Sequence, residues 1–295
     1  MKRSLFPIAL ALSILLAGCS AGAAADTSAA SQSAAATTAA TAAATSAQTT
    51  AAATAAETTA AADLVLPLTG NTSGKVQIQT VSANPSYKYT SYIITSIEGE
   101  SVVVDPTMMP DKKTVDISPA AIISTHSHDD HICKVFTDSY DCQKILYEPG
   151  DIKTLDFHIY TVASSHANDT ILAKPSNFIV VFEVDGLRIA HMGDIGQTVL
   201  TDDQLAAIGP IDIAFMQFEN SYSDMSLKNE KGFNLIEQLN PKIIVPTHYT
   251  DDAIPVLTEK YGAITELENV MTISKEDLPQ DTLQVYHITN THKYK

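Results

Sequence analysis

The sequence predicts an α+β domain, with a layered αββα architecture in which sheets and helices occupy separate layers. Two observations lead to this prediction. Many short apolar runs bounded by turn residues come first and form hairpins, and helical patterns interleave only later along the chain. A doubly wound parallel sheet would instead alternate strands and helices throughout. Once its first 62 residues are set apart, the 295-residue chain is long enough for one large domain or two small ones.

The first 18 residues have the features of a secretory signal peptide. Met1-Lys2-Arg3 is cationic, and the apolar run from Leu5 to Ala17 is too short to span a membrane. The run ends in Leu16-Ala17-Gly18-Cys19, which resembles a bacterial lipobox, where the cysteine thiol receives a diacylglycerol and becomes the mature N-terminus. Two acyl chains give stable anchoring. We therefore expect a lipoprotein of the bacterial cell envelope, anchored on the extracytoplasmic side of a membrane; an ordinary signal peptide with an incidental cysteine is the alternative.

Residues 20–62 predict a disordered tether between the lipidated Cys19 and a folded region at 63–295. Ala, Thr and Ser make up 38 of these 43 residues, and the segment contains no aromatic residue, Leu, Ile, Val or Pro. Such a segment buries too little apolar surface to offset the entropy of ordering it.

The folded region carries the whole net charge of −16. All 18 Lys and Arg residues except Lys2 and Arg3 lie in it, as do all 34 Asp and Glu residues except Asp26 and Glu57. An acidic surface repels phosphate backbones, so we expect no nucleic-acid partner. No apolar run in this region reaches the length of a membrane-spanning helix, which excludes a multi-pass membrane protein.

Within the folded region, turn residues separate the predicted strands. Asp185-Gly186 is the strongest short hairpin signal, and Glu98-Gly99-Glu100 joins a second hairpin. The predicted strands are Val76–Val81, Tyr92–Ile97, Ser101–Val104, Ala120–Thr125, Lys144–Tyr147, Phe157–Val162, Phe178–Val184, Leu187–His191, Ile211–Phe218 and Lys242–Val245. The predicted helices are Asp202–Ile208, Lys231–Leu239 and Asp251–Tyr261.

Strand Ala120–Thr125 leads directly into a cluster of metal-ligand residue types, His126-Ser127-His128-Asp129-Asp130-His131. In an extended segment, positions 126 and 128 project to the same side, so the two imidazoles can bind one ion. If the chain then turns into a helix, Asp130 and His131 are presented beside them for a second ion. A solvated polar loop is the alternative, but the buried strand that leads straight into the cluster favours a metal site.

His126-x-His128-x-Asp130-His131 resembles the signature of the metallo-β-lactamase superfamily, whose fold is a four-layer αββα sandwich with a two-metal site at one edge. The family's further ligands each follow a strand, and the chain supplies them in order in Ser164-Ser165-His166, Met192-Gly193-Asp194 and Pro246-Thr247-His248. The resemblance covers residues 75–250 in motif order. It implies that His126, His128 and His166 hold one divalent ion, that Asp130, His131 and His248 hold the other, and that Asp194 bridges them.

Four other histidines are not predicted to be metal ligands. His158 competes with His166, but it lies inside an apolar strand, whereas His166 follows that strand. No role is assigned to His191, His287 or His292, and the last two are expected to be exposed near the C-terminus.

The resemblance implies a metal-dependent hydrolase with two divalent ions. The histidine-rich donor set suits zinc, with manganese or iron(II) as alternatives. A hydroxide that bridges the two ions would attack an ester, lactone or phosphodiester of a small substrate, and Asp130 would take the nucleophile's proton. The site would be a small cationic spot on an acidic domain, suited to a substrate with one anionic group or a developing oxyanion. A non-catalytic metal-binding lipoprotein that retains the fold is the alternative.

The ligand set also indicates a branch of the superfamily. One class of zinc β-lactamases has Cys where this chain has Asp194, and the full set looks like the glyoxalase II, phosphodiesterase and sugar-phosphate lactonase-like branches. The stretch 231–249 most resembles the lactonase-like hydrolases. That branch tends to have a Gly-rich turn after the strand at 211–218, where this chain reads Glu219-Asn220-Ser221-Tyr222. Glu219, Asn220 and Tyr249 are candidates for substrate contacts, with ordinary loop residues as the alternative.

The two cysteines of the folded region are Cys133 and Cys142. A disulfide between them is permitted outside the cytoplasm, and a buried thiol on a helix after His131 is the equal alternative for Cys133.

Overall fold

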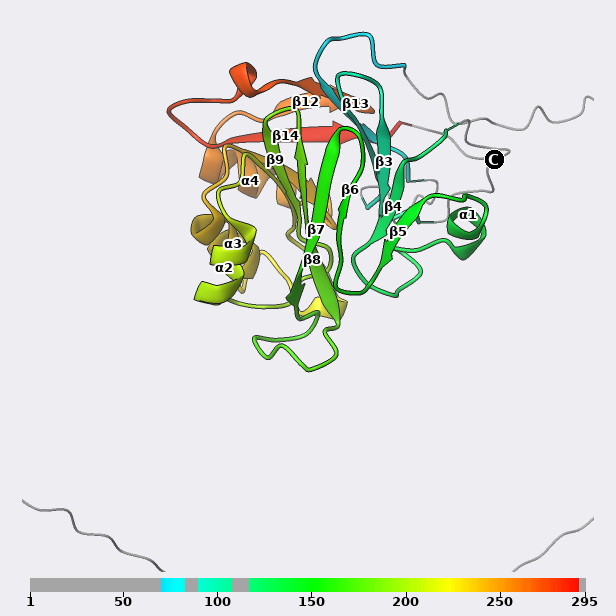
Figure 1. Cartoon of the computed structure of the whole chain (residues 1–295). Helices are drawn as coiled ribbons and strands as arrows, with labels where there is room; N and C mark the ends of the chain where they lie inside the picture. The colour runs from blue at the N-terminus through cyan, green and yellow to red at the C-terminus, as the bar shows by residue number, and fades with distance from the viewer. Residues whose placement is uncertain (1–69, 83–89, 108–116, 292–295) are drawn as a thin grey trace, which may run out of the picture. The chain divides into compact units, whose positions relative to one another are not determined.

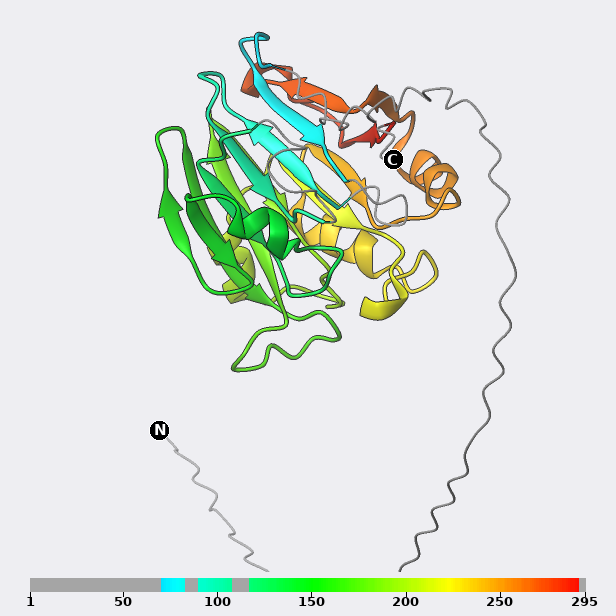
Figure 2. The same cartoon turned by 90° about the vertical axis from the view of Figure 1, so that its right-hand side faces the viewer.

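Two β-sheets pack face to face in the computed structural model, which describes residues 70–82, 90–107 and 117–291 (Figures 1 and 2). In the order in which its strands pair, the six-stranded sheet consists of β13 (Val270–Ile273), β1 (Val76–Thr80), β2 (Tyr92–Thr95), β3 (Ser101–Val104), β4 (Ala121–Ser124) and β5 (Gln143–Leu146). The eight-stranded sheet consists of β12 (Thr265–Glu268), β14 (Gln284–Thr289), β11 (Ile243–Thr247), β10 (Ile213–Gln217), β9 (Leu187–His191), β8 (Asn177–Val184), β7 (Phe157–Ser164) and β6 (Asp151–Lys153).

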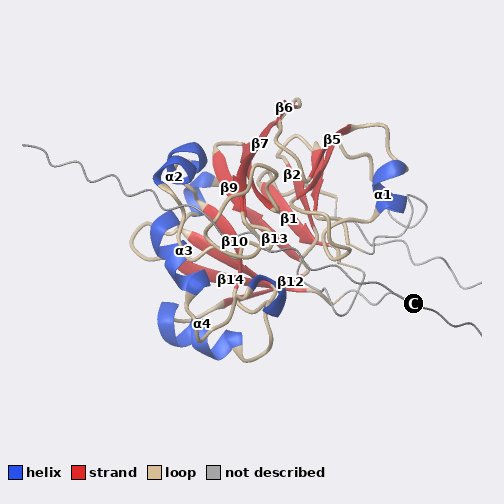
Figure 3. Ribbon diagram, turned by 90° about the horizontal axis from the view of Figure 1, so that it is seen from below, coloured by secondary structure: helices blue, strands red, loops and turns tan. Residues whose placement is uncertain are grey.

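Helices cover the outer faces of both sheets. Seen from below, α2 (Asp202–Ile208), α3 (Lys231–Leu239) and α4 (Ala253–Tyr261) lie along the eight-stranded sheet, and the short α1 (Lys134–Asp138) lies beside the six-stranded one (Figure 3). Each sheet mixes parallel and antiparallel pairs: β3, β4 and β5 run parallel, and so do β9, β10 and β11. The predicted layered αββα architecture is confirmed.

The period-2 alternation of the strands builds three apolar clusters. In β8, Val180 and Phe182 face the other sheet, while Ile179 and Val181 pack against the helical layer. In β3, Val103 points outward toward Phe136 of α1, whereas its two neighbours point inward. Because both faces of the central strands are covered, these strands read as continuous apolar runs in the sequence.

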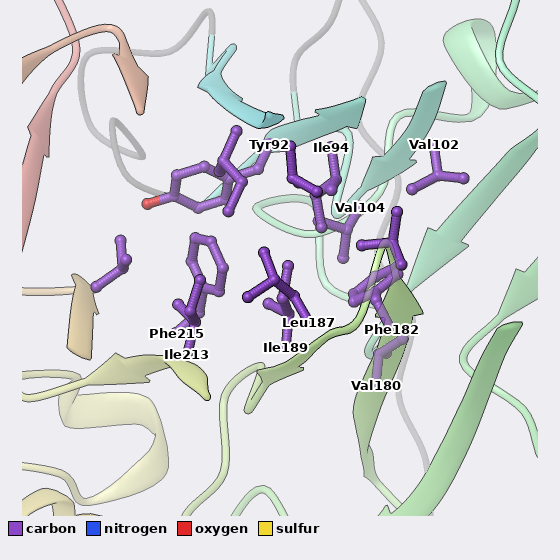
Figure 4. Packing of buried hydrophobic residues seen from close by; sticks show 14 of the residues in the cluster. Tyr92, Ile94, Val102, Val104, Val180, Phe182, Leu187, Ile189, Ile213 and Phe215 are labelled. Atoms are coloured by element: carbon purple, nitrogen blue, oxygen red, sulfur yellow. The ribbon is translucent and has the colours of Figure 1, made fainter. Parts of the chain in front are cut away.

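The cluster between the sheets is the main core of the domain (Figure 4). Tyr92 of β2 meets Phe215 of β10 across it, with ring centroids 4.6 Å apart. Both side chains are buried, as is Phe182 from β8. Truncating a buried aromatic side chain of this kind costs about 3–5 kcal/mol. The two sheets are thereby fixed relative to one another, and so are the loops at their edges.

The strand pattern predicted from sequence is confirmed, with boundaries that differ by one or two residues. Asp185 and Gly186 both have positive φ, 48° and 78°, as expected of the two-residue turn between β8 and β9. Gly99, with φ 97°, lies in the turn between β2 and β3. The helix expected after His131 begins only at Lys134.

The C-terminal part of the fold went unpredicted. β12 and β14 pair in parallel and extend the eight-stranded sheet, whereas β13 returns to pair with β1 in the other sheet. The expectation that His287 is exposed is wrong, because it lies in β14 with only 8% of its surface exposed.

Cys133 and Cys142 are free thiols, each half-buried, so the disulfide alternative is not realised. Burial raises the pKa of the Cys142 thiol above its usual value. Among the described residues, no helix has the length and apolar character that crossing a bilayer requires. The leader and tether expected over 1–62, with Cys19, lie outside the described residues, as does His292.

Candidate metal centre

The seven candidate ligands gather at one edge of the sandwich, where several strands end. His126 comes two residues after β4, and His166 comes two residues after β7. Asp194 follows β9, and His248 directly follows β11. Because β7, β9 and β11 share one direction in their sheet, their carboxyl ends meet at the same edge. Figure 3 looks toward this edge from below.

The structure brings these residues together as two groups that share Asp194. In each group one donor atom per residue lies within 4.8 Å of all the others. The first group is His126, His128, His166 and Asp194; the second is Asp130, His131, Asp194 and His248. The division between the two ions that the resemblance implied coincides with these two groups.

Asp194 presents one carboxylate oxygen to each group. Its Oδ2 lies 3.6 Å from His126 Nε2 and 3.4 Å from His166 Nε2. Its Oδ1 lies 3.2 Å from the Nε2 atoms of both His131 and His248. A carboxylate placed in this way can bridge two ions, each held through one oxygen.

The second group brings two histidine nitrogen atoms and two carboxylates into close contact. The Asp105 carboxylate lies 2.7 Å from His131 Nδ1, and a carboxylate can only accept, so Nδ1 carries the proton. Binding of a cation requires a neutral ring, in which His131 Nε2 would present a lone pair 3.1 Å from His248 Nε2 and 3.2 Å from Asp194 Oδ1. Such a convergence of electron-rich atoms is favourable around a cation. Ligand atoms on a tetrahedral ion with bonds of about 2.0–2.1 Å lie about 3.3 Å apart, which matches this spacing.

The first group shows the same convergence in a different form. His126 Nε2 and His166 Nε2 are buried and lack a hydrogen-bond partner among the described residues. Buried polar atoms are normally hydrogen-bonded, so two orphan nitrogen atoms aimed at one carboxylate require an explanation. His128 completes the group from the solvent side, with its ring centroid 4.8 Å from that of His126 and 4.9 Å from that of His166. The donor set fits a divalent ion.

Burial and neighbouring charges set the protonation states. Burial lowers the pKa of His126, and the nearby His131 lowers it further. For His131 burial acts in the same direction, but the carboxylates of Asp105 and Asp194 outweigh it and raise the pKa. Burial alone would raise the pKa of Asp194, yet His248 and His131 hold it well below the usual range. The bridging carboxylate is therefore ionised.

A buried carboxylate that the sequence reasoning missed supports the second group. Asp105 accepts from the backbone N–H of Thr125 at 2.7 Å and from its hydroxyl, besides holding His131. It directly follows β3, at the same edge as the ligands, and has a φ of 49°. A carboxylate behind a ligating histidine fixes the ring orientation and makes the ring a better ligand. The available signal was an Asp placed directly after an apolar strand.

Two amides hold Asp194 in place. The side-chain oxygen of Asn177 accepts from the Asp194 backbone N–H at 3.0 Å, and Asn220 Nδ2 donates to the carboxylate at 2.7 Å. Gly193, with φ 57°, permits the tight approach, because a Cβ there would lie 2.5 Å from the Asn177 side-chain oxygen and 2.7 Å from Thr125 Cβ.

The residues expected at the substrate have other partners. The Asn220 amide is directed at Asp194, and the Glu219 carboxylate accepts from the Thr250 backbone N–H at 2.9 Å. The Tyr249 hydroxyl contacts His287 Nε2, whose Nδ1 lies 2.7 Å from Glu266. His158 lies outside both groups and pairs instead with Asp151 and Glu183, which agrees with the preference for His166.

Comparison with known proteins identifies the family. Residues 86–248, more than half of the chain, match the family described as Beta-lactamase superfamily domain. A relative named UPF0173 metal-dependent hydrolase from Lysinibacillus sphaericus (strain C3-41) is 27% identical over 199 residues, covering 56% of this chain and 84% of the relative. A relative of the same name from Staphylococcus carnosus (strain TM300) is 24% identical over 219 residues, covering 62% of this chain and 92% of the relative.

Among solved structures, a candidate zinc-dependent hydrolase of the metallo-β-lactamase superfamily from Thermotoga maritima has the same fold. It matches with a TM-score of 0.53 at 20% identity, over 72% of this chain and all of the other.

Proposed function

The chain belongs to the beta-lactamase superfamily and is a metal-dependent hydrolase, and from that premise we propose that its seven clustered ligands form a dinuclear centre that hydrolyses an ester, lactone or phosphodiester of a small substrate. His126, His128 and His166 hold one ion, Asp130, His131 and His248 hold the other, and Asp194 bridges them. The observation that carries the proposal is the shared Asp194, with one oxygen directed at each group of histidine nitrogens.

Five histidines and two aspartates suit two zinc ions better than magnesium or calcium, which prefer oxygen ligands. Two such ions, when bound, supply Lewis acidity, lower the pKa of a water molecule and stabilise developing negative charge. The protein's own task is to hold the donors in place, and the buried Asp105, Asn177 and Asn220 do this.

Asp130 is the residue that moves the proton. Burial would raise its pKa, but a hydrogen bond from His248 and the nearby His131 lower it below the usual value, so the carboxylate is ionised near neutral pH. Its Oδ2 lies 3.4 Å from His248 Nε2, and 18% of the side chain is exposed, so water can reach it. An ionised carboxylate beside the nucleophile is suited to act as general base.

The test is Asp130→Asn, with Asp129→Asn as the matched control. Both substitutions remove one charge from adjacent positions, but Asp129 is exposed and belongs to neither group. Hydrolysis of 4-nitrophenyl acetate, a simple lactone and bis(4-nitrophenyl) phosphate by the zinc-loaded protein should identify the reactive class. For that class, Asp130→Asn should lower kcat by about 10²–10⁴-fold while at least one ion is retained, and Asp129→Asn should retain the activity. Equal activity of the two variants would contradict the role of Asp130.

We also propose that the protein is anchored through Cys19 on the extracytoplasmic side of a membrane. The support is the Leu16-Ala17-Gly18-Cys19 ending after a basic and then apolar leader. In a bacterial host the unchanged protein should fractionate with membranes and incorporate radiolabelled palmitate. Cys19→Ala should abolish the labelling and release the protein from the membrane, and an unaltered distribution would overturn the anchor.

A further inference from the structure

A cavity opens onto the first ligand group from the solvent side. Its volume is about 350 Å³, and both His128 and His166 line it. The remaining lining comes from Ser127, from Tyr147 after β5, and from both ends of the loop between β7 and β8: Ala167 at its start, and Lys174, Pro175 and Ser176 at its end. This volume lies at the small end of ligand pockets, which span about 300–1,000 Å³. A larger cavity of about 580 Å³, lined by 153–158 and 183–188, contains no residue of either ligand group.

The charge of this cavity differs from that of the rest of the protein. None of the Asp and Glu residues in the described part of the chain lines it, although the chain has 34 acidic and only 18 basic residues. Its one charged lining residue is Lys174, which is exposed and is paired with no carboxylate among the described residues. Hydroxyl groups of Ser127, Ser176 and Tyr147 add hydrogen-bonding capacity, and Ala167 and Pro175 add apolar surface. Such a lining favours a small molecule with one negative group.

Hydrogen bonds from backbone N–H groups to side chains fix the β7–β8 loop, which carries Lys174. This loop forms the lowest part of the domain in Figure 1. The Ser176 hydroxyl accepts from the His166 backbone N–H at 3.0 Å, which ties the end of the loop to a ligand. The Ser165 hydroxyl accepts from two N–H groups at the start of the loop. The Asp169 carboxylate accepts from the Val199 N–H at 3.3 Å, outside the loop. Lys174 is therefore presented by a loop whose ends are anchored beside the ligands.

Another lining residue, Tyr147, shows backbone strain. Tyr147 has a φ of 47°, which is unusual for a bulky side chain, and its N–H donates to the Ser124 carbonyl of β4 at 2.8 Å. Strained residues of this kind cluster where a ligand is bound. Tyr147 is 38% exposed and lines the cavity.

We propose that Lys174 determines specificity, by binding an oxyanion group of a small ester or lactone whose scissile bond lies toward His128 and His166. This inference rests on the proposed hydrolase function and adds the substrate class: a compact molecule with one carboxylate or phosphate group and a short linker to the reacting carbonyl. The Lys174 ammonium binds that group, and the Tyr147 ring packs against the linker.

The test compares two esters with the same leaving group, neutral 4-nitrophenyl acetate and anionic mono-4-nitrophenyl succinate, on the zinc-loaded protein. The variants are Lys174→Glu and the control Lys242→Glu, which changes the net charge equally. Lys242 is exposed and precedes β11, whereas His248 follows this strand, so the control lies at the opposite edge. Lys174→Glu should lower the ratio of kcat/KM values, anionic over neutral ester, by about tenfold, and Lys242→Glu should leave the ratio within about twofold. Lys174→Arg should restore most of the ratio.

A binding measurement separates failure of this inference from failure of the hydrolase proposal. Succinanilic acid and acetanilide are amide counterparts of the two esters, and their dissociation constants can be measured by ligand-observed NMR titration. The unchanged protein should bind the anionic amide more tightly, and Lys174→Glu should abolish this preference. If neither ester is hydrolysed, the ester form of the hydrolase proposal fails, while the amides still decide the role of Lys174. Equal binding of the two amides, or equal effects of Lys174→Glu and Lys242→Glu, would overturn the inference.

Discussion

The two ligand groups share Asp194, but the fold builds them in different ways. In the second group, His131 is fully buried, and the buried Asp105 holds it from behind. In the first group, His128 is exposed and borders the cavity next to a long surface loop. The second group thus contains a fully buried histidine held from behind, whereas the first contains an exposed histidine beside the cavity. We infer that substrate approaches from the side of the first group, while the more firmly held second group fixes the position of Asp194.

The largest expected effect comes from Asp194→Asn, which removes the one residue common to both groups. Loss of the shared negative charge should reduce metal content from about two equivalents to less than one, and should lower hydrolysis by roughly a thousandfold. Asp185→Asn in the β8–β9 turn, where Asn tolerates the positive φ, is the control and should retain both ions. Elemental mass spectrometry measures the result, and two equivalents retained by Asp194→Asn would contradict the bridging role.

His128→Ala should separate the two groups. It removes a ligand of the first group only, so the affinity for one ion should fall by more than about 100-fold while the second ion stays bound. Because His128 is exposed, the thermal unfolding temperature of the metal-free protein should hardly change. His158→Ala, which alters a half-buried histidine outside both groups, should leave both affinities unchanged. Loss of both ions from His128→Ala would show that the groups are not independent.

Asp105→Asn should weaken binding of the ion in the second group, by a smaller factor than His128→Ala weakens binding of the ion in the first. Replacing the carboxylate behind His131 weakens the orientation and basicity of the ring, and such changes lower metal affinity by about 10–100-fold. The weakened ion should be that of the second group, so calorimetric titration should show one altered and one unaltered binding step. If the altered step were the one that His128→Ala abolishes, the assignment of Asp105 to the second group would be wrong.

The smallest effect concerns His191, which is buried behind the second group. Burial lowers its pKa to about 4, and the neighbouring His131 and His248 lower it as well, whereas Asp105 opposes the shift. Between pH 6.5 and 4 the unfolded chain therefore binds more protons at this residue, so its contribution to stability is complete above pH 6.5 and falls as the pH drops. About 1 kcal/mol should be lost between pH 7 and 5.5.

Urea titration of the metal-free protein at pH 7 and 5.5 measures this loss. His191→Gln has no group that titrates in this range, so it should show a flatter pH dependence. An equal slope in the two proteins would exclude His191 as its source.

Local patterns made much of this molecule predictable. The cluster 126–131 is contiguous, so one strand and one turn are enough to place its ligands. The β8–β9 hairpin was predictable because Asp185 and Gly186 adopt the positive φ that this turn requires. The later ligands could be found because the resemblance to the superfamily places each of them after a strand, and the sequence supplies a His or Asp there in the right order. The αββα layers could be predicted because hairpin strands come first and helices interleave later.

The unpredicted parts depend on contacts between distant segments. β13 pairs with β1 although nearly 200 residues separate them, and no local pattern encodes such a pairing. Asp105 before Pro106 looks like an ordinary turn until the fold places it behind His131. His287 is buried because Tyr249 and Glu266 surround it in the structure, although its sequence position suggests an exposed terminus.

The measurement that tests the account most directly is the metal content of the purified protein after incubation with zinc, manganese or iron(II). The shared Asp194 and the two groups of histidine nitrogens predict about two equivalents of one of these metals per chain. Stepwise titration of a chelator should remove the ion of the first group, which includes the exposed His128, before that of the second group, which includes the fully buried His131. A chain that binds none of the three metals after each incubation would contradict the dinuclear centre and the hydrolytic function built on it.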